Sequence, residues 1–240
     1  MERWQNASYI QESFVTIALQ REYDKKANPQ LVRWEQPIKI FLESDFGDAS
    51  LQKELLSIHL SHLSSITNIP IQFVNRRQDG NIFIIFTSYN NLEPKVAEYI
   101  GDPNKMRAAI KEAICLGNFS YNRQSEITKG TIIIPVDYAR QKARFLDCIV
   151  EEITQLMGLP NDSDNVYPSI FNDRSIDSYL SPLDYLLLKL LYSDRLYAGM
   201  TLKDVEKALP KAIRDLLNCG DIKYAARRVR ENSLQQYLGD

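Results

Sequence analysis

The sequence predicts an α/β (α+β) domain with additional helices at both ends of the chain. Short β-rich runs alternate with longer segments in which apolar residues recur at helical spacing. The chain has 240 residues, 44% of them hydrophobic, so it can bury one substantial core. Its longest apolar run, residues 185–192, is too short to cross a bilayer and contains Lys189. We therefore expect no transmembrane segment.

The N-terminal half is predicted to contain a helix, a strand, a second helix and two more strands. Ile10, Phe14 and Ile17 recur at helical spacing, so we expect a helix that ends before Pro29. The next elements are a strand at residues 38–42, a capping turn at 45–50, a helix at 51–65 and strands at 71–74 and 82–86. The polar residues 75–81 between these two strands indicate a hairpin or a loop.

The C-terminal half contains the strongest strand and helix patterns. Residues 90–104 are expected to be irregular and to lead into a helix at about 105–114, before a strand at 130–137. A helix at 143–157 has one apolar stripe, and Gly158 and Pro160 end it. A polar loop at 161–173 precedes a helix that begins at Ser181-Pro182 and reaches Tyr192, and the chain from Thr201 onward is helical and charged. The expected organisation is an N-terminal helical segment (1–32), a central domain (33–195) and a C-terminal helical extension packed on it (196–240).

The charges of the chain nearly cancel, with 29 Lys and Arg against 31 Asp and Glu, which argues against a nucleic-acid partner. The cysteines lack the spacing of a zinc knuckle or a redox motif. Cys115 and Cys148 form either a disulfide, which suits an oxidising compartment, or two free thiols, and Cys219 remains unpaired. A nucleophilic Cys148 is disfavoured because no histidine base is identifiable near it. The two histidines, His59 and His62, are expected at the surface or at the edge of the core.

The segment from residue 151 to residue 162 reads EEITQLMGLPND and carries the candidate site. Residues at i and i+4 lie on one face of a helix, which is where a zinc hydrolase places two histidines, with a glutamate general base directly after the first. Glu151 and Gln155 occupy the two ligand positions, Glu152 the position of the base and Asn161 the third ligand position, with Asp162 beside it. Alternatively, these residues form only the solvated face of an amphipathic helix.

This segment, followed by L-S-x-x-D at 180–184 and L-Y at 191–192, resembles the H-E-x-x-H-x-x-G-L-x-H region of matrixin-like metzincins. The chain is also similar to a family of uncharacterised bacterial envelope proteins, a domain of unknown function, with the signature E-E-x-T-Q-x-x-G-L-P-N-D-S followed by P-S-I-F-N-D. The first resemblance implies a zincin-like (metzincin-type) mixed sheet with an active-site-type helix in residues 33–195.

The resemblance also implies that the zinc site is lost. Gln155 and Asn161 are poor zinc ligands, and Ser169-Ile170-Phe171 stands where the Met-turn methionine is expected. We therefore expect no metal and no cofactor. A calcium site made of Glu151, Gln155 and Asp162 would have too few oxygens. A two-carboxylate glycosidase would need Asp162, Asp164 or Asp173 as a partner.

The function implied is that of a pseudo-metallopeptidase whose cleft binds a peptide or another protein through Glu151, Gln155, Asn161, Asp162 and Ser169. One alternative is an atypical hydrolase, a peptidase or a glycosidase, in which Glu152 is the catalytic general base. Another is a structural component of the envelope with an envelope-associated partner. The expected location is periplasmic, lipid-anchored or secreted, with an export signal removed ahead of Met1.

Overall fold

The computed structural model describes residues 2–19, 29–172, 174–175 and 178–240. Its strands are β1 (Ile38–Ser44), β2 (Ile71–Val74), β3 (Ile82–Thr87), β4 (Leu116–Tyr121) and β5 (Ile127–Pro135). Its helices are α1 (Ala7–Leu19), α2 (Ala49–Thr67), α3 (Leu92–Tyr99), α4 (Arg107–Glu112), α5 (Val136–Gln141), α6 (Phe145–Gln155), α7 (Pro182–Leu191), α8 (Leu202–Asn218), α9 (Asp221–Arg228) and α10 (Leu234–Leu238). No helix in these ranges is long and apolar enough to cross a membrane.

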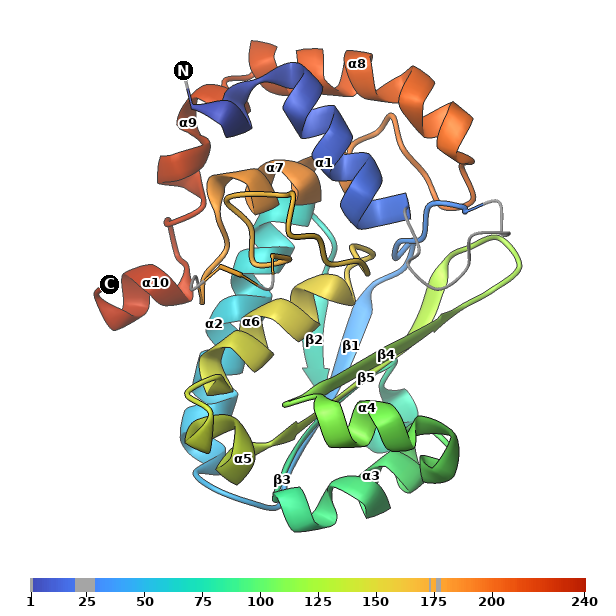
Figure 1. Cartoon of the computed structure of the whole chain (residues 1–240), viewed down its shortest axis with the longest axis vertical. Coiled ribbons are helices and arrows are strands. Elements are labelled where there is room, and N and C mark those ends of the chain that lie inside the picture. Colours follow the sequence, from blue (N-terminus) through green and yellow to red (C-terminus); the bar gives the residue numbers. More distant parts are fainter. Residues whose placement is uncertain (1, 20–28, 173, 176–177) are drawn as a thin grey trace.

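The strands form one mixed sheet in the order β2-β1-β3-β5-β4. β1 pairs in parallel with both β2 and β3, and β3 pairs in parallel with β5. β4 pairs antiparallel with β5 and lies at the edge of the sheet (Figure 1). The prediction of a hairpin at residues 75–81 is therefore wrong, because β2 and β3 lie on opposite sides of β1 and do not pair with each other.

Helices cover both faces of the sheet, so its central strands are apolar on both sides. On β3, Ile82, Ile84 and Phe86 face the main core, whereas Phe83 and Ile85 face a smaller one. The main core is completed by α1, α2, α6 and α7, and the smaller core by α3 and the neighbouring residues (Figure 1).

The helical terminal segments pack on the same main core. The side chains of Ile10 and Phe14 in α1 and of Val205 and Leu209 in α8 are fully buried in it. α8 lies against α1, and α9 lies against α7 (Figure 1). Residues far apart in sequence thus form one continuous apolar cluster.

Several boundaries differ from the sequence prediction. The chain between β3 and α4, expected to be irregular, contains α3, whose Leu92 and Val96 are buried in the smaller core. The predicted strand at 130–137 begins at Ile127 and ends at Pro135, where α5 begins. Strand β4 was not predicted, because Gly117, Asn118 and Ser120 dilute its apolar pattern. Because β4 lies beside α6, the sequence prediction also lacked the element that α6 faces.

Candidate functional site

Most of the predicted site residues lie on α6 or in the loop that follows it. The apolar face of α6, including Ile149, Val150 and Ile153, is buried in the main core. Gly158 ends the helical segment with φ +114°, and a Cβ atom at this position would overlap the carbonyl oxygen of Val32. Glycine alone adopts this backbone without strain and permits the close approach.

The buried Trp34 and the half-buried Tyr192 bind the carbonyl groups at the C-terminal end of α6, which have no partner within the helix. Trp34 Nε1 donates to the carbonyl oxygen of Leu156 at 2.8 Å. The Tyr192 hydroxyl donates to the carbonyl oxygen of Met157 at 2.7 Å, and it accepts from the backbone amide of Trp34 at 3.3 Å. The segment before β1 and the end of α7 therefore hold α6 in place.

Glu152 faces the edge strand β4. Its Oε2 atom lies against the Cα of Gly117 and occupies the space that a side chain there would fill. Gly117 is itself exposed, whereas Glu152 is partly buried. Within the described ranges, the Glu152 side chain has neither a hydrogen bond nor an ion pair. A carboxyl group without a partner thus lies under an exposed strand.

The surroundings of Glu152 favour its protonated form. Burial raises the pKa of its carboxyl group, and the negative charges of Glu151 and Asp162 raise it further, to about 8. At pH 7 the group is therefore mostly a neutral carboxylic acid, which can donate a hydrogen bond to a carbonyl oxygen. A strongly perturbed carboxyl group beside two other carboxylates is typical of functional sites, although structural clusters also produce it.

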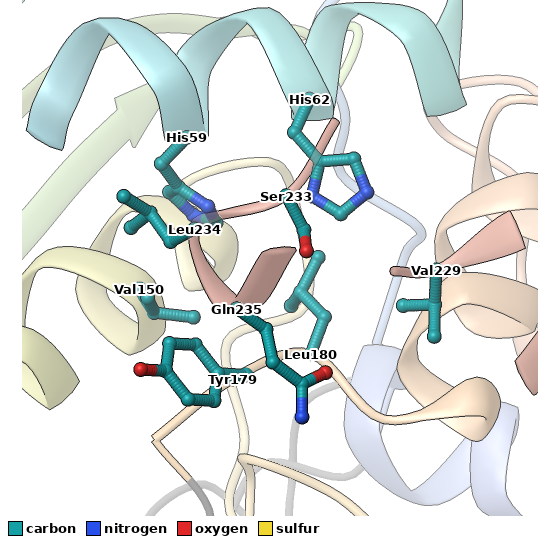
Figure 2. A pocket seen from close by; sticks show the side chains of 9 residues that line it. All are labelled: His59, His62, Val150, Tyr179, Leu180, Val229, Ser233, Leu234 and Gln235. Carbon is teal, nitrogen blue, oxygen red and sulfur yellow. The ribbon is translucent and has the colours of Figure 1, made fainter. Parts of the chain in front are cut away.

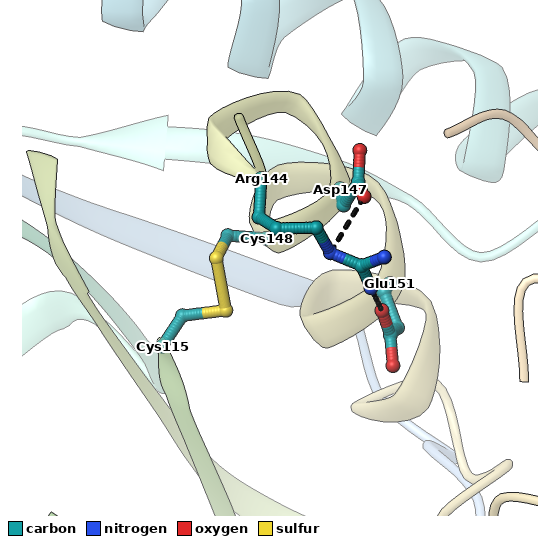
Figure 3. Close-up of a disulfide and its surroundings, with 5 residues drawn as sticks. All are labelled: Cys115, Arg144, Asp147, Cys148 and Glu151. Carbon is teal, nitrogen blue, oxygen red and sulfur yellow. Dashed lines mark hydrogen bonds and ion pairs between the residues drawn. A yellow bond between two sulfur atoms is a disulfide. The ribbon is translucent and has the colours of Figure 1, made fainter. Parts of the chain in front are cut away.

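The two predicted ligand positions on α6 are engaged by neighbouring side chains. Glu151 Oε2 lies 3.4 Å from Arg144 Nη2, and Arg144 Nε pairs with Asp147 Oδ2 at 2.8 Å (Figure 3). Gln155 Nε2 donates to Asp162 Oδ1 at 2.9 Å. Glu151, Glu152, Gln155 and Asp162 are thus brought together at one end of the helix face.

Asn161 and Ser169 serve other parts of the structure. Asn161 Nδ2 donates to the carbonyl oxygen of Ile17 at 3.0 Å and so binds the C-terminal end of α1. Ser169 is buried, and its hydroxyl donates to Asp184 Oδ1 at 2.6 Å. The polar groups of both residues are thus used within the fold, and the cleft roles predicted for them stay predictions.

Asp184 organises the turn at residues 169–171. Its carboxylate accepts from the backbone amides of Ile170 at 3.1 Å and Ser181 at 2.8 Å, in addition to the Ser169 hydroxyl. Burial raises the pKa of Asp184 to about 6, and these hydrogen bonds oppose the increase. The loop after α6 and the start of α7 are joined through this one side chain.

No cluster of metal-ligand side chains is found in the part of the chain that the structure describes. Among the described residues, no group of three or more His, Cys, Asp or Glu side chains is arranged to hold a metal ion. Two further carboxylates were predicted as possible partners in a glycosidase. Asp164 pairs with Arg174 at 2.7 Å on the surface, and Asp173 lies outside the described residues. The expectation that no metal is bound stays a prediction.

The histidines of α2 are buried, contrary to the expected surface or core-edge position: His59 is 1% exposed and His62 is 2% exposed. His59 Nε2 lies 3.2 Å from the Thr154 hydroxyl of α6, whereas His62 Nε2 has no hydrogen-bond partner. Both rings face a small cavity under Tyr179 and Gln235 (Figure 2). Burial lowers the pKa of His59 to about 3 and that of His62 to about 4.

Cys115 and Cys148 are joined by a disulfide, which is one of the two states left open by the sequence (Figure 3). The bond connects the residue before β4 to the first turn of α6. Cys148 is therefore not available as a nucleophile. Cys219 is a free thiol, and its Sγ donates to Asp221 Oδ2 at 2.9 Å.

The sequence interpretation missed Gly117 and the strand that carries it. Leu116, Phe119 and Tyr121 mark β4 weakly, and a turn at residues 122–126 joins it to β5. The alternation of Phe119 and Tyr121 with polar residues before this turn is the signal of an antiparallel pair.

A family model described as a protein of unknown function (DUF2927) matches residues 7–211, which include all five strands and the whole candidate site. No curated protein matches the chain.

Proposed function

The chain belongs to the DUF2927 family of proteins of unknown function, and we propose that the free edge of β4 beside α6 forms a cleft that binds a peptide or another protein. In this proposal the fold is zincin-like, and the protein is a pseudo-metallopeptidase. Three features support the zincin-like assignment: the mixed sheet with an antiparallel edge strand, the helix beside that strand, and the turn at Gly158.

The observation that carries the proposal is the free edge of β4. β4 is the last strand of the sheet, so its outer backbone groups have no partner strand within the described residues. An extended peptide can add to such an edge through its own backbone N–H and C=O groups. The exposed Gly117, without a side chain, leaves the backbone accessible next to Glu152.

The carboxyl group of Glu152 supplies a second interaction. In its neutral form it can donate to a carbonyl oxygen of the ligand, which a carboxylate cannot do. Glu151 and Asp162 lie close enough to raise its pKa, and they give the same end of the cleft a negative charge. We therefore expect ligands with a basic residue near the bound carbonyl group.

Peptide-library selection on the purified protein tests this proposal. A peptide that adds as a strand uses the N–H groups of alternate residues, so N-methylation should weaken binding at every second position and leave the intervening positions unaffected. Glu152→Gln retains an amide donor and should bind nearly normally, whereas Glu152→Ala should bind more weakly. Equal effects at all methylated positions, or binding that is insensitive to Glu152, would refute the cleft mode.

The hydrolase alternative is favoured by one observation, the raised pKa of Glu152. A carboxyl group with a pKa of about 8 can donate a proton at neutral pH and act as a general base only at higher pH. If the protein is a peptidase or glycosidase that uses Glu152 as the base, its rate should rise with pH through about 8. Glu152→Gln should then abolish the activity with little change in the melting temperature.

A structural role in the envelope makes a different prediction: substitutions at Glu152 would have no effect, and surface substitutions would disrupt assembly.

For all three functions we propose an oxidising location, either periplasmic, lipid-anchored or secreted. The Cys115–Cys148 disulfide supports this location, since such bonds persist where thiols are not kept reduced. Fractionation of cells that express the protein from its own gene tests it.

A further inference from the structure

We propose that a pocket between the start of α7, the end of α9 and α10 binds a small hydroxy acid, with the ligand carboxylate on Arg230 and Tyr179 and the ligand hydroxyl toward His62. The residues that line this C-terminal pocket are Pro168, 179–182, Ala226, 229–230 and Gln235. None of them belongs to β4 or to the carboxyl cluster on α6. The inference therefore goes beyond the proposed function and does not depend on it.

The C-terminal pocket has the size and the lining of a small-molecule site. Its volume is about 340 Å³, within the usual range of ligand pockets, roughly 300–1,000 Å³. Leu180 and Val229 form an apolar wall and are 7% and 3% exposed, and Tyr179 and Gln235 add polar groups. Among the lining residues that the structure describes, Arg230 is the only charged one. The pocket therefore fits a ligand with an apolar body and one negative charge.

The position of Asp240 shows where a carboxylate can bind. Arg230 Nη2 donates to the main-chain oxygen of Asp240 at 2.5 Å, and the Tyr179 hydroxyl donates to Asp240 Oδ2 at 2.5 Å. Two donors from different segments thus converge on the oxygens of one acidic residue. Arg230 and Asp240 are exposed, and contacts between exposed charges contribute little to stability. A ligand that also buries apolar surface against Leu180 and Val229 can therefore displace Asp240.

A buried polar atom without a partner lies behind the pocket. His62 is 2% exposed, and its Nε2 has no hydrogen bond to any described residue. The ring faces a smaller cavity of about 10 Å³, which has four lining residues in common with the C-terminal pocket: Tyr179, Leu180, Val229 and Gln235 (Figure 2). Side chains alone separate the two spaces. Gln235 is only partly buried, and rotation of its side chain is the movement that joins them.

The chemistry of His62 favours a hydroxyl group on the ligand. Burial lowers the pKa of His62 to about 4, so the ring is neutral at pH 7. The Nε2 atom of a neutral ring is either a donor or an acceptor, according to the tautomer, and a hydroxyl group can pair with both. A buried nitrogen without a partner is unfavourable, so a hydrogen bond to His62 strengthens binding.

The experiment is an NMR titration of ¹⁵N-labelled protein with butyrate, hexanoate and their ω-hydroxy forms, and with hexanol as the uncharged probe. The amide signals of Val229 and Arg230 should shift and saturate with the acids. Hexanoate should bind at least about tenfold more tightly than hexanol, because only the acid pairs with Arg230. At the chain length that spans the distance from Arg230 to His62, the hydroxy acid should bind about tenfold more tightly than the plain acid.

Substitutions separate the two ends of the ligand. Arg230→Gln should weaken the binding of every acid by about tenfold or more. Arg227→Gln is the matched control and should bind as the wild type does, because Arg227 pairs with Glu231 at 3.3 Å and does not line the pocket. Asp240→Ala removes the internal competitor and should strengthen binding of the acids about two- to fivefold.

His62→Leu should remove the advantage of the hydroxy acid and leave the affinity for hexanoate unchanged. A lack of saturation with all four acids, in both the wild type and Asp240→Ala, would overturn the proposal. Equal binding of hexanoate and hexanol by the wild type would overturn the carboxylate position, and equal binding of hydroxy and plain acids of both lengths would overturn the role of His62. These comparisons on the wild type do not require any variant to fold.

Discussion

Replacement of the buried His62 by glutamine should change how the stability of the protein depends on pH. His62 is 2% exposed, and burial lowers its pKa from 6.5 to about 4. The unfolded chain therefore binds a proton below pH 6.5 that the folded chain does not bind until about pH 4. The contribution of His62 to the free energy of unfolding is therefore complete above about pH 6.5. It decreases as the pH drops and is lost by about pH 4.

The magnitude follows from the two pKa values. Between pH 7 and pH 5, preferential protonation of His62 in the unfolded state lowers the free energy of unfolding by about 2 kcal/mol. The wild-type curve alone does not reveal this, because Glu152 and Asp184 have raised pKa values and act in the opposite direction. Their protonation on acidification favours the folded state. The difference between wild type and variant isolates the histidine.

Urea unfolding at pH 7 and pH 5 provides the assay. From pH 7 to pH 5, the free energy of unfolding should fall by about 2 kcal/mol less in His62→Gln than in the wild type. His59→Gln should behave similarly, because burial lowers the pKa of His59 to about 3. Identical pH dependence in wild type and His62→Gln would refute the assignment of a buried neutral ring. The absolute stability at pH 7 serves as the control for lost packing.

Three further outcomes follow from the site and its supports. Glu152→Gln should stabilise the protein relative to wild type by about 2–3 kcal/mol more at pH 9 than at pH 6, since the buried charge that forms as the pH rises is removed; chemical denaturation at both values checks this. Gly158→Ala should destabilise the fold by about 2 kcal/mol or more, because φ is +114° and the added Cβ meets Val32, and a drop in the urea midpoint would show it. Ser169→Ala should cost about 1–3 kcal/mol in urea unfolding, because Asp184 and the amide of Phe171 each lose a buried hydrogen bond; an unchanged midpoint would contradict the role of this turn.

Local sequence patterns predicted the elements in which a single period dominates. The apolar stripe of α6 and the Ser181-Pro182 start of α7 are examples, since spacing and capping residues specify a helix whatever its surroundings. The strand at Ile132–Ile134 was recognised for the same reason, because an unbroken apolar run is typical of a strand buried on both faces. β4 escaped prediction because an exposed edge strand needs no such run.

The chemical groups that α6 can present follow from the order of residues alone: two adjacent glutamates, a glutamine one turn later and no histidine nearby in the chain. What each group does depends on the contacts made in the folded protein. It placed Gly117 over Glu152, turned Asn161 toward α1 and Ser169 toward Asp184, and buried His59 and His62 against α6 and the C-terminal segment. The physical reason is that burial and charge neighbours depend on contacts between residues distant in sequence. Local periodicity specifies a helix face but not what covers it.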